Sequence, residues 1–155
     1  MLIVPIVTYN NTYQDKDLIL KQNRKKSGIY RGVQIESAKS YTGSSVNLSI
    51  RFSQYFNYNH ISDYKHNMAI YRALLRYGYT PFRLEILEYC SREKLMEREQ
   101  LYLDKCKPKY NILKLAGSSV GFKHSEPSKE LKSQLAKGRL LCTETLLKMK
   151  ERTVL

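Results

Sequence analysis

The sequence predicts a small α+β domain, in which helices flank a three-stranded antiparallel sheet and an extended basic C-terminal tail follows. Three observations predict this class: a strand–turn–strand pattern at 28–42, a strictly alternating segment at 82–89, and helical apolar spacing on both sides of that segment. We divide the 155 residues into an N-terminal extension at 1–25, a core domain at 26–113 and the tail at 114–155.

The first two strands are expected at 28–34 and 40–42, joined by a short polar turn. A pattern of this length is typical of a β-hairpin. Across such a ladder Tyr30 and Tyr41 can come close, and Gly43 leaves room for another group to approach. Ordinary packing of two tyrosines would fit the same pattern, so the hairpin alone does not predict a site.

The segment after the hairpin predicts a helix that presents an arginine and a tyrosine on one face. Ser44 or Ser45 can cap it, and Arg51 and Tyr55 lie four residues apart. A guanidinium can hold a phosphate through two hydrogen bonds and offset charge that develops in phosphoryl transfer. Taken alone, an arginine on a helix is usually only a solvated charge.

Two more helices and the third strand follow. After a polar loop at 57–67, the apolar spacing predicts a helix at 68–77 that ends at a glycine. Strict alternation then predicts the strand at 82–89. Ser91 can cap a last helix that runs to about residue 105.

One carboxylate falls in the apolar stripe of that last helix. Glu99 shares a face with Leu95, Tyr102 and Leu103. A carboxylate in such a place is costly unless it is paired or bound to a cation. The residues leave two readings open: an ion pair with an arginine such as Arg51, or a ligand of Mg²⁺, which prefers oxygen donors and keeps most of its waters.

Phenols and one amide are the other candidates. A tyrosine such as Tyr30, Tyr41 or Tyr55 can act as a base only if its pKa falls from about 10, which a nearby cation can achieve. Each of them alone is more often a core residue. Asn111 follows the last helix and can tie the chain end to the sheet, either as plain structure or beside a site.

Composition narrows the function classes. The chain has 27 basic and 14 acidic residues and a net charge of +13. This charge favours a polyanionic partner such as nucleic acid, and the alternative is a soluble basic protein without such a partner. Cys90, Cys106 and Cys142 are widely spaced, so neither a disulfide framework nor a zinc site is predicted. The apolar start is too short to span a membrane, and no membrane partner is expected. His60 and His66 are expected at the surface.

Five motifs, in order, resemble those of the GIY-YIG nuclease family. They are Gly28-Ile29-Tyr30, Tyr41-Thr42-Gly43, Arg51 with Tyr55, Arg98-Glu99-Gln100 and Tyr110-Asn111-Ile112. The stretches that resemble homing endonucleases encoded in group I introns of fungal mitochondria are 44–48, 74–79, 84–89 and 116–125. Thr42 stands where the family usually has isoleucine or valine, a change that a sheet tolerates.

This resemblance implies a GIY-YIG nuclease-like fold, hydrolysis of double-stranded DNA and a mitochondrial location, and it leaves intron RNA open as a second partner. The implied site residues are Tyr30, Tyr41, Arg51, Tyr55, Glu99 and Asn111. Glu99 would hold one Mg²⁺ or Mn²⁺ at the scissile phosphate, and Tyr30 would orient or deprotonate the attacking water. Arg51, with the other two tyrosines, would stabilise the developing charge.

Two alternatives remain on the same fold: a catalytically weak nucleic-acid-binding protein or intron-splicing cofactor, and a structure-specific repair nuclease.

The tail resembles the start of a short DNA-binding module found after such nuclease domains, and it carries nine basic and four acidic residues. It has few large apolar residues before Leu140, so we expect a basic arm with a modest helix at 128–135 rather than a second core. The tail residues expected to contact DNA are Lys123, His124, Lys129 and Lys132. An uninvolved terminus is the alternative.

Overall fold

A computed structural model describes residues 2–117, 124–137 and 147. The chain divides into two compact units, residues 1–122 and residues 123–155. Within the described part of the chain, no helix is both long and apolar enough to cross a bilayer.

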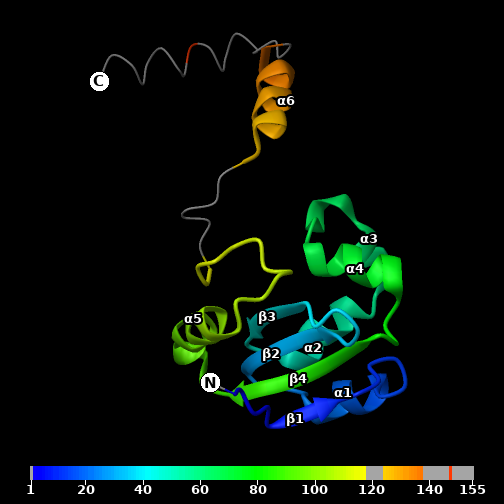
Figure 1. The fold of residues 1–155 in the computed structure, drawn as a ribbon. Helices are drawn as coiled ribbons and strands as arrows, with labels where there is room; N and C mark the ends of the chain where they lie inside the picture. Colours follow the sequence, from blue (N-terminus) through cyan, green and yellow to red (C-terminus); the bar gives the residue numbers. More distant parts are fainter. Residues whose placement is uncertain (1, 118–123, 138–146, 148–155) are drawn as a thin grey trace. The chain divides into compact units, whose positions relative to one another are not determined.

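The first unit is built on a four-stranded antiparallel sheet with the strand order β1–β4–β2–β3 (Figure 1). The strands are β1 (Val7–Tyr9), β2 (Gly28–Gln34), β3 (Ser40–Ser45) and β4 (Phe82–Tyr89). The α+β class is confirmed, but the expected number of three strands is wrong. A three-residue edge strand shows no readable alternation, and its pairing with β4 becomes visible only in the structure.

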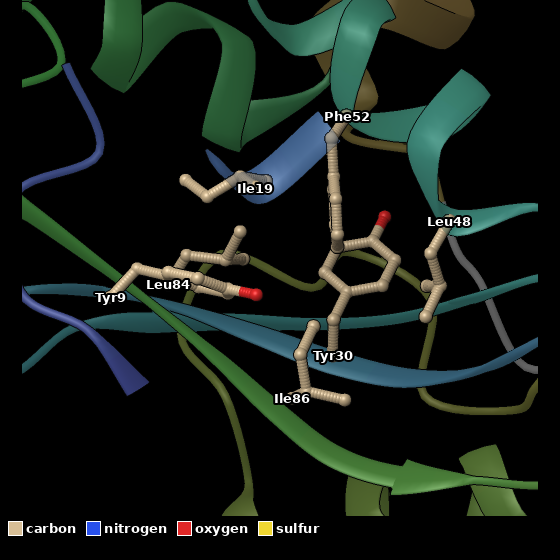
Figure 2. Packing of buried hydrophobic residues seen from close by; sticks show 7 residues of the cluster. All are labelled: Tyr9, Ile19, Tyr30, Leu48, Phe52, Leu84 and Ile86. Atoms are coloured by element: carbon tan, nitrogen blue, oxygen red, sulfur yellow. The ribbon is translucent and has the colours of Figure 1, made fainter. Parts of the chain in front are cut away.

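Residues before the hairpin take part in the same core. Helix α1 (Lys16–Gln22) forms within the segment assigned to the N-terminal extension and has seven residues. Its Ile19 is fully buried and packs with Tyr9 and Tyr30 (Figure 2). Strand β1 and helix α1 therefore contribute to the sheet and the core that hold Tyr30.

The helix that carries Arg51 begins later than expected from Ser44 or Ser45 as its N-cap. Strand β3 continues to Ser45, and helix α2 (Leu48–Tyr55) is capped by Asn47, whose side chain accepts a hydrogen bond from the Ile50 amide. An asparagine is as good an N-cap as a serine, and the pairing of Ser44 and Ser45 with β2 keeps both serines extended.

The expectation of an irregular loop at 57–67 is also wrong. It contains helix α3 (Tyr58–Ser62) and a 3₁₀ turn at Tyr64–His66, because the side chains of Asn57 and Asp63 cap the two segments. Helix α4 (Ala69–Tyr77) follows and ends at Gly78, as expected; a 3₁₀ turn at 92–94 precedes helix α5 (Leu95–Cys106).

The sheet is covered on both faces (Figure 1). Along β2 the side chains alternate, so that Ile29 packs with Leu87 and Leu95 on the α5 side while Tyr30 packs with Phe52 on the α2 side. Strand β3 forms one edge of the sheet. At this edge, groups from the two faces can come together, and the candidate site is built there. The second unit contains helix α6 (Glu126–Lys137), which includes the expected 128–135 segment and buries no residue.

Candidate active site

Two tyrosines of the hairpin lie side by side on the α2 face. Tyr30 pairs with Gly43 across the ladder, and the ring centroids of Tyr30 and Tyr41 are 6.3 Å apart. A Cβ atom at position 43 would lie 2.8 Å from the Tyr30 hydroxyl and 2.9 Å from the Tyr41 ring. Glycine is required here because any side chain would displace both phenols.

Arg51 of helix α2 reaches into this cluster and meets only neutral partners. Its Nε donates to the Tyr30 hydroxyl at 3.1 Å, and one terminal nitrogen donates to the Tyr71 hydroxyl at 2.9 Å and to Gln54 Oε1 at 2.8 Å. The other terminal nitrogen lies 3.4 Å from the Tyr55 hydroxyl. No carboxylate of the described residues forms an ion pair with it. The cluster thus holds a partly buried positive charge without an anion.

The phenols of Tyr30, Tyr41 and Tyr55 keep their protons at neutral pH. Burial raises the pKa of Tyr30 above its ordinary value, although the Arg51 charge opposes the shift. Burial, reinforced by neighbouring phenols, also raises the pKa values of Tyr41 and Tyr55. The hydroxyls of Tyr30 and Tyr55 are hydrogen-bonded at 2.8 Å. In this arrangement, a protonated Tyr30 suits orientation of a water better than its deprotonation.

Glu99 of helix α5 approaches the same edge from the other face of the sheet. It is half-buried, and its Oε2 accepts a hydrogen bond from the Ser44 hydroxyl at 2.5 Å. The ion pair with Arg51 that the sequence left open does not form in the described structure. Glu99 lines an open groove of about 380 Å³ together with Tyr41 and Asn111. After burial and Tyr30, the Glu99 charge is one of the causes that raise the pKa of Tyr41, so the two side chains are electrostatic neighbours.

The donor set around Glu99 suits a metal that keeps most of its waters. Across the residues that the structure describes, no three His, Cys, Asp or Glu side chains gather in a group that could hold a metal. Mg²⁺ is commonly held by one or two carboxylates and completes its shell with water and substrate phosphate oxygens. A single carboxylate on an open groove fits that kind of ion and does not fit a dedicated all-protein cage.

Asn111 fastens the edge of the sheet rather than facing Arg51. Its side-chain oxygen accepts from the Thr42 amide and its side-chain nitrogen donates to the Thr42 carbonyl, both at 2.8 Å. The Tyr110 amide donates to the Ser40 carbonyl. These bonds fix the strand that carries Tyr41, so Asn111 lies beside the site and supports it.

Tyr71 and His60 are contacts of the site that the sequence analysis missed. Tyr71 of α4 fits the apolar stripe of its helix, yet its hydroxyl accepts from Arg51 and is hydrogen-bonded to His60 at 3.2 Å. His60 is half-buried instead of exposed, and its ring stacks on His66 with centroids 4.2 Å apart. Burial and the charge of His66 lower the pKa of His60. The sequence signal that could have indicated the role of Tyr71 is a tyrosine at a core position, because a buried phenol needs a polar partner.

The described tail residues contact one another within the second unit. Lys129 forms an ion pair with Glu126, and the Lys132 ammonium lies 3.1 Å from His124 Nε2. Lys123 lies outside the described residues. Nothing in these contacts tests DNA binding, so the role of the tail stays a prediction.

Comparison with known proteins settles the family. The profile of the GIY-YIG catalytic domain matches residues 26–111, which include Tyr30, Arg51, Glu99 and the other residues of the candidate active site but not the tail. The chain belongs to the GIY-YIG family. Among solved structures, a variant of the catalytic domain of intron endonuclease I-TevI is similar in fold, with a TM-score of 0.50 and 24% identity, over 57% of this chain and 95% of that one.

Two curated relatives of this GIY-YIG chain come from Neurospora crassa. Probable intron-encoded endonuclease 1 is 30% identical over 138 residues, which cover 81% of this chain. Probable intron-encoded endonuclease bI1 is 29% identical over an alignment of 173 positions, gaps included, which covers 98% of this chain. The matches span only 43% and 38% of those relatives' own lengths.

Proposed function

We propose that this protein is a homing endonuclease that hydrolyses phosphodiester bonds of double-stranded DNA with a divalent metal, Mg²⁺ or Mn²⁺. The observation that carries the proposal is Arg51, a partly buried cation surrounded by neutral hydroxyl, amide and thioether groups. A buried charge without a counter-ion is costly, and a phosphodiester at this edge of the sheet would supply the missing anion. Its two Neurospora crassa relatives are named as probable intron-encoded endonucleases, which supports an intron-encoded gene, and we extend this to a mitochondrial one.

Each site residue then has a physical task. Glu99 would hold the metal, which supplies Lewis-acid stabilisation of the phosphate and lowers the pKa of a bound water. Arg51 would bind the phosphate oxygens and offset charge that develops on them. The protonated phenols of Tyr30 and Tyr55, hydrogen-bonded to each other, would fix the Arg51 fork and present a donor to the attacking water. Tyr41 would lie between Arg51 and Glu99, which are both its electrostatic neighbours. Asn111 would hold the strand that carries Tyr41.

The tail would add affinity rather than chemistry. Helix α6 buries none of its residues and carries Lys129 and Lys132. We propose that these lysines, with Lys123 and His124, contact DNA phosphates, because backbone contacts supply most non-specific affinity. Intron RNA remains a second candidate partner.

Cleavage of supercoiled plasmid with and without divalent metal tests the proposal. Glu99→Gln should reduce metal-dependent cleavage at least about a thousandfold while leaving DNA affinity in EDTA unchanged, because affinity comes from Lys and Arg. Glu97→Gln, on an exposed position of the same helix, is the matched control and should cleave like the wild type. A wild type that binds but never cleaves would assign the protein to the binding or splicing class instead.

A further inference from the structure

A basic groove lies between helices α1 and α2, and no residue of the tyrosine cluster lines it. The side chains of Lys21, Arg24 and Lys25 are exposed and line an open hollow of about 860 Å³. The other residues that line it are Asp17, Leu20, Asn47, Ser49, Ile50 and Ser53. We call this hollow the basic groove.

The backbone under the basic groove is fixed by hydrogen bonds. The Leu48 amide donates to the Lys26 carbonyl at 2.8 Å, and the Ser49 amide donates to the Asn23 carbonyl at 3.3 Å. The Ser49 hydroxyl donates to the Leu20 carbonyl at 2.8 Å. The first amides of α2 are therefore satisfied within the protein, and any attraction for anions comes from the side-chain cations.

Those cations are not neutralised by the fold. Within residues 2–117, none of Lys21, Arg24 and Lys25 forms an ion pair. Their neighbour Lys26 differs, since its ammonium lies 4.9 Å from the centre of the Tyr89 ring. Asp17 is the one carboxylate among the lining residues, so the basic groove has a positive excess. Repeated phosphates are the natural partner of such a surface.

A short stretch of chain joins the basic groove to the residue that binds Glu99. Ser44, whose hydroxyl binds Glu99, is three residues before Asn47, which lines the groove. Three residues span at most about 11 Å. Because a DNA strand rises about 3.4 Å per phosphate, this distance corresponds to a few nucleotides.

We infer that the basic groove binds backbone phosphates of duplex DNA a few nucleotides from the phosphate held between Arg51 and Glu99. This inference rests on the proposed function for the position of the scissile phosphate. The groove contributes affinity and orientation, and its residues do not touch the reacting atoms.

Lysine acylation followed by mass spectrometry tests the contact directly on the full chain. In EDTA, a 40-base-pair duplex should protect Lys21 and Lys25 several-fold while leaving Lys39 and Lys94, both exposed, as reactive as in the free protein. Equal reactivity of Lys21 and Lys25 with and without the duplex would overturn the inference. Protection by duplex RNA but not by duplex DNA would also overturn it, and would identify RNA as the ligand of the groove.

A charge-matched pair of variants gives the energetic test. Replacing Lys21, Arg24 and Lys25 by Gln should lower the slope of log Kd against log salt by about 2 to 3, since each lost phosphate contact releases about one counter-ion fewer. The control replaces Lys39, Arg92 and Lys94 by Gln and should keep the wild-type slope. Equal slopes in the two variants would contradict a groove contact. Binding in EDTA needs no cleavage, so a wild type that fails to cleave would overturn the proposed function without deciding this result.

Discussion

Two arginines of the GIY-YIG domain, Arg31 and Arg51, are partly buried, yet the structure uses their charges differently. Arg31 forms an ion pair with Glu85, whose carboxylate also pairs with Arg83 and is only 4% exposed. Arg51 is held by hydroxyl and amide groups and has no carboxylate partner in the described structure. Arg31 is thus paired with a carboxylate within the fold, whereas Arg51 has only neutral partners among the described residues.

The carboxylates show the same contrast. Glu88 accepts two hydrogen bonds from the Arg98 guanidinium and one from Tyr102. Glu99 is one helical position beyond Arg98, yet it accepts only the Ser44 hydroxyl and no cation of the described residues pairs with it. Arg51 and Glu99 are therefore an unpaired cation and an unpaired anion at one edge of the sheet. A phosphate with a divalent cation would satisfy both.

Among the tyrosines that surround Arg51, the largest effect is expected from Tyr30. Tyr30→Phe keeps the ring, so the core packing should hold, while cleavage falls about a hundredfold because the hydroxyl next to Arg51 is lost. Tyr9→Phe is the matched control, since Tyr9 lies in the same core and its hydroxyl donates to Gln22. The control should cost about 1 kcal/mol of stability and no activity per folded molecule. Single-turnover cleavage and thermal unfolding measure both, and full activity of Tyr30→Phe would show that its hydroxyl is structural.

A smaller effect is expected from Tyr71. Its hydroxyl is one of the neutral groups that fix the Arg51 guanidinium, so Tyr71→Phe should loosen the fork and slow cleavage about tenfold with little loss of DNA affinity. Tyr79→Phe is a suitable control, because the Tyr79 hydroxyl donates to the Tyr55 carbonyl and does not reach Arg51. If both variants slow cleavage equally, general loosening of the core explains the result.

The smallest effect concerns the tail, where two lysines of one helix differ in their pairing. Lys129 forms an ion pair with Glu126, whereas Lys132 has no carboxylate partner in the described part of the chain. If unpaired cations are the ones that bind DNA, Lys132→Gln should lower the salt slope of binding by about 0.9 and Lys129→Gln by less. Fluorescence anisotropy over a salt series measures this, and two unchanged slopes would show that the tail does not contact DNA.

Much of the fold could be read from the sequence because its signals are local. The strand patterns predict the strands at 28–34 and 82–89. A glycine after an apolar stripe predicts the helix end at Gly78, where the structure has a positive φ. The misses are short: β1 and α3 have three and five residues. In elements of that length, pairing and capping decide the structure, and hydrophobic periodicity is too short to show.

The candidate site was less readable, because it depends on partners that are far apart in sequence. The motif residues could be named, yet neither the neutral surroundings of Arg51 nor the Ser44–Glu99 hydrogen bond follows from any spacing. Tyr71 fits a core position because its ring is buried, and only its hydroxyl contacts Arg51. Whether an arginine has a carboxylate partner depends on the tertiary structure. Arg31 and Arg51 therefore cannot be distinguished from the sequence alone.

The most direct measurement compares Arg51→Lys with Arg31→Lys. Lysine keeps the charge and loses the fork, so we expect Arg51→Lys to lose cleavage at least about a hundredfold while its unfolding temperature stays near that of the wild type. Arg31→Lys should cleave normally per folded molecule and lose about 1 to 3 kcal/mol of stability through Glu85. The opposite pattern, an active Arg51→Lys and a stable but inactive Arg31→Lys, would contradict the assignment of Arg51 to the phosphate.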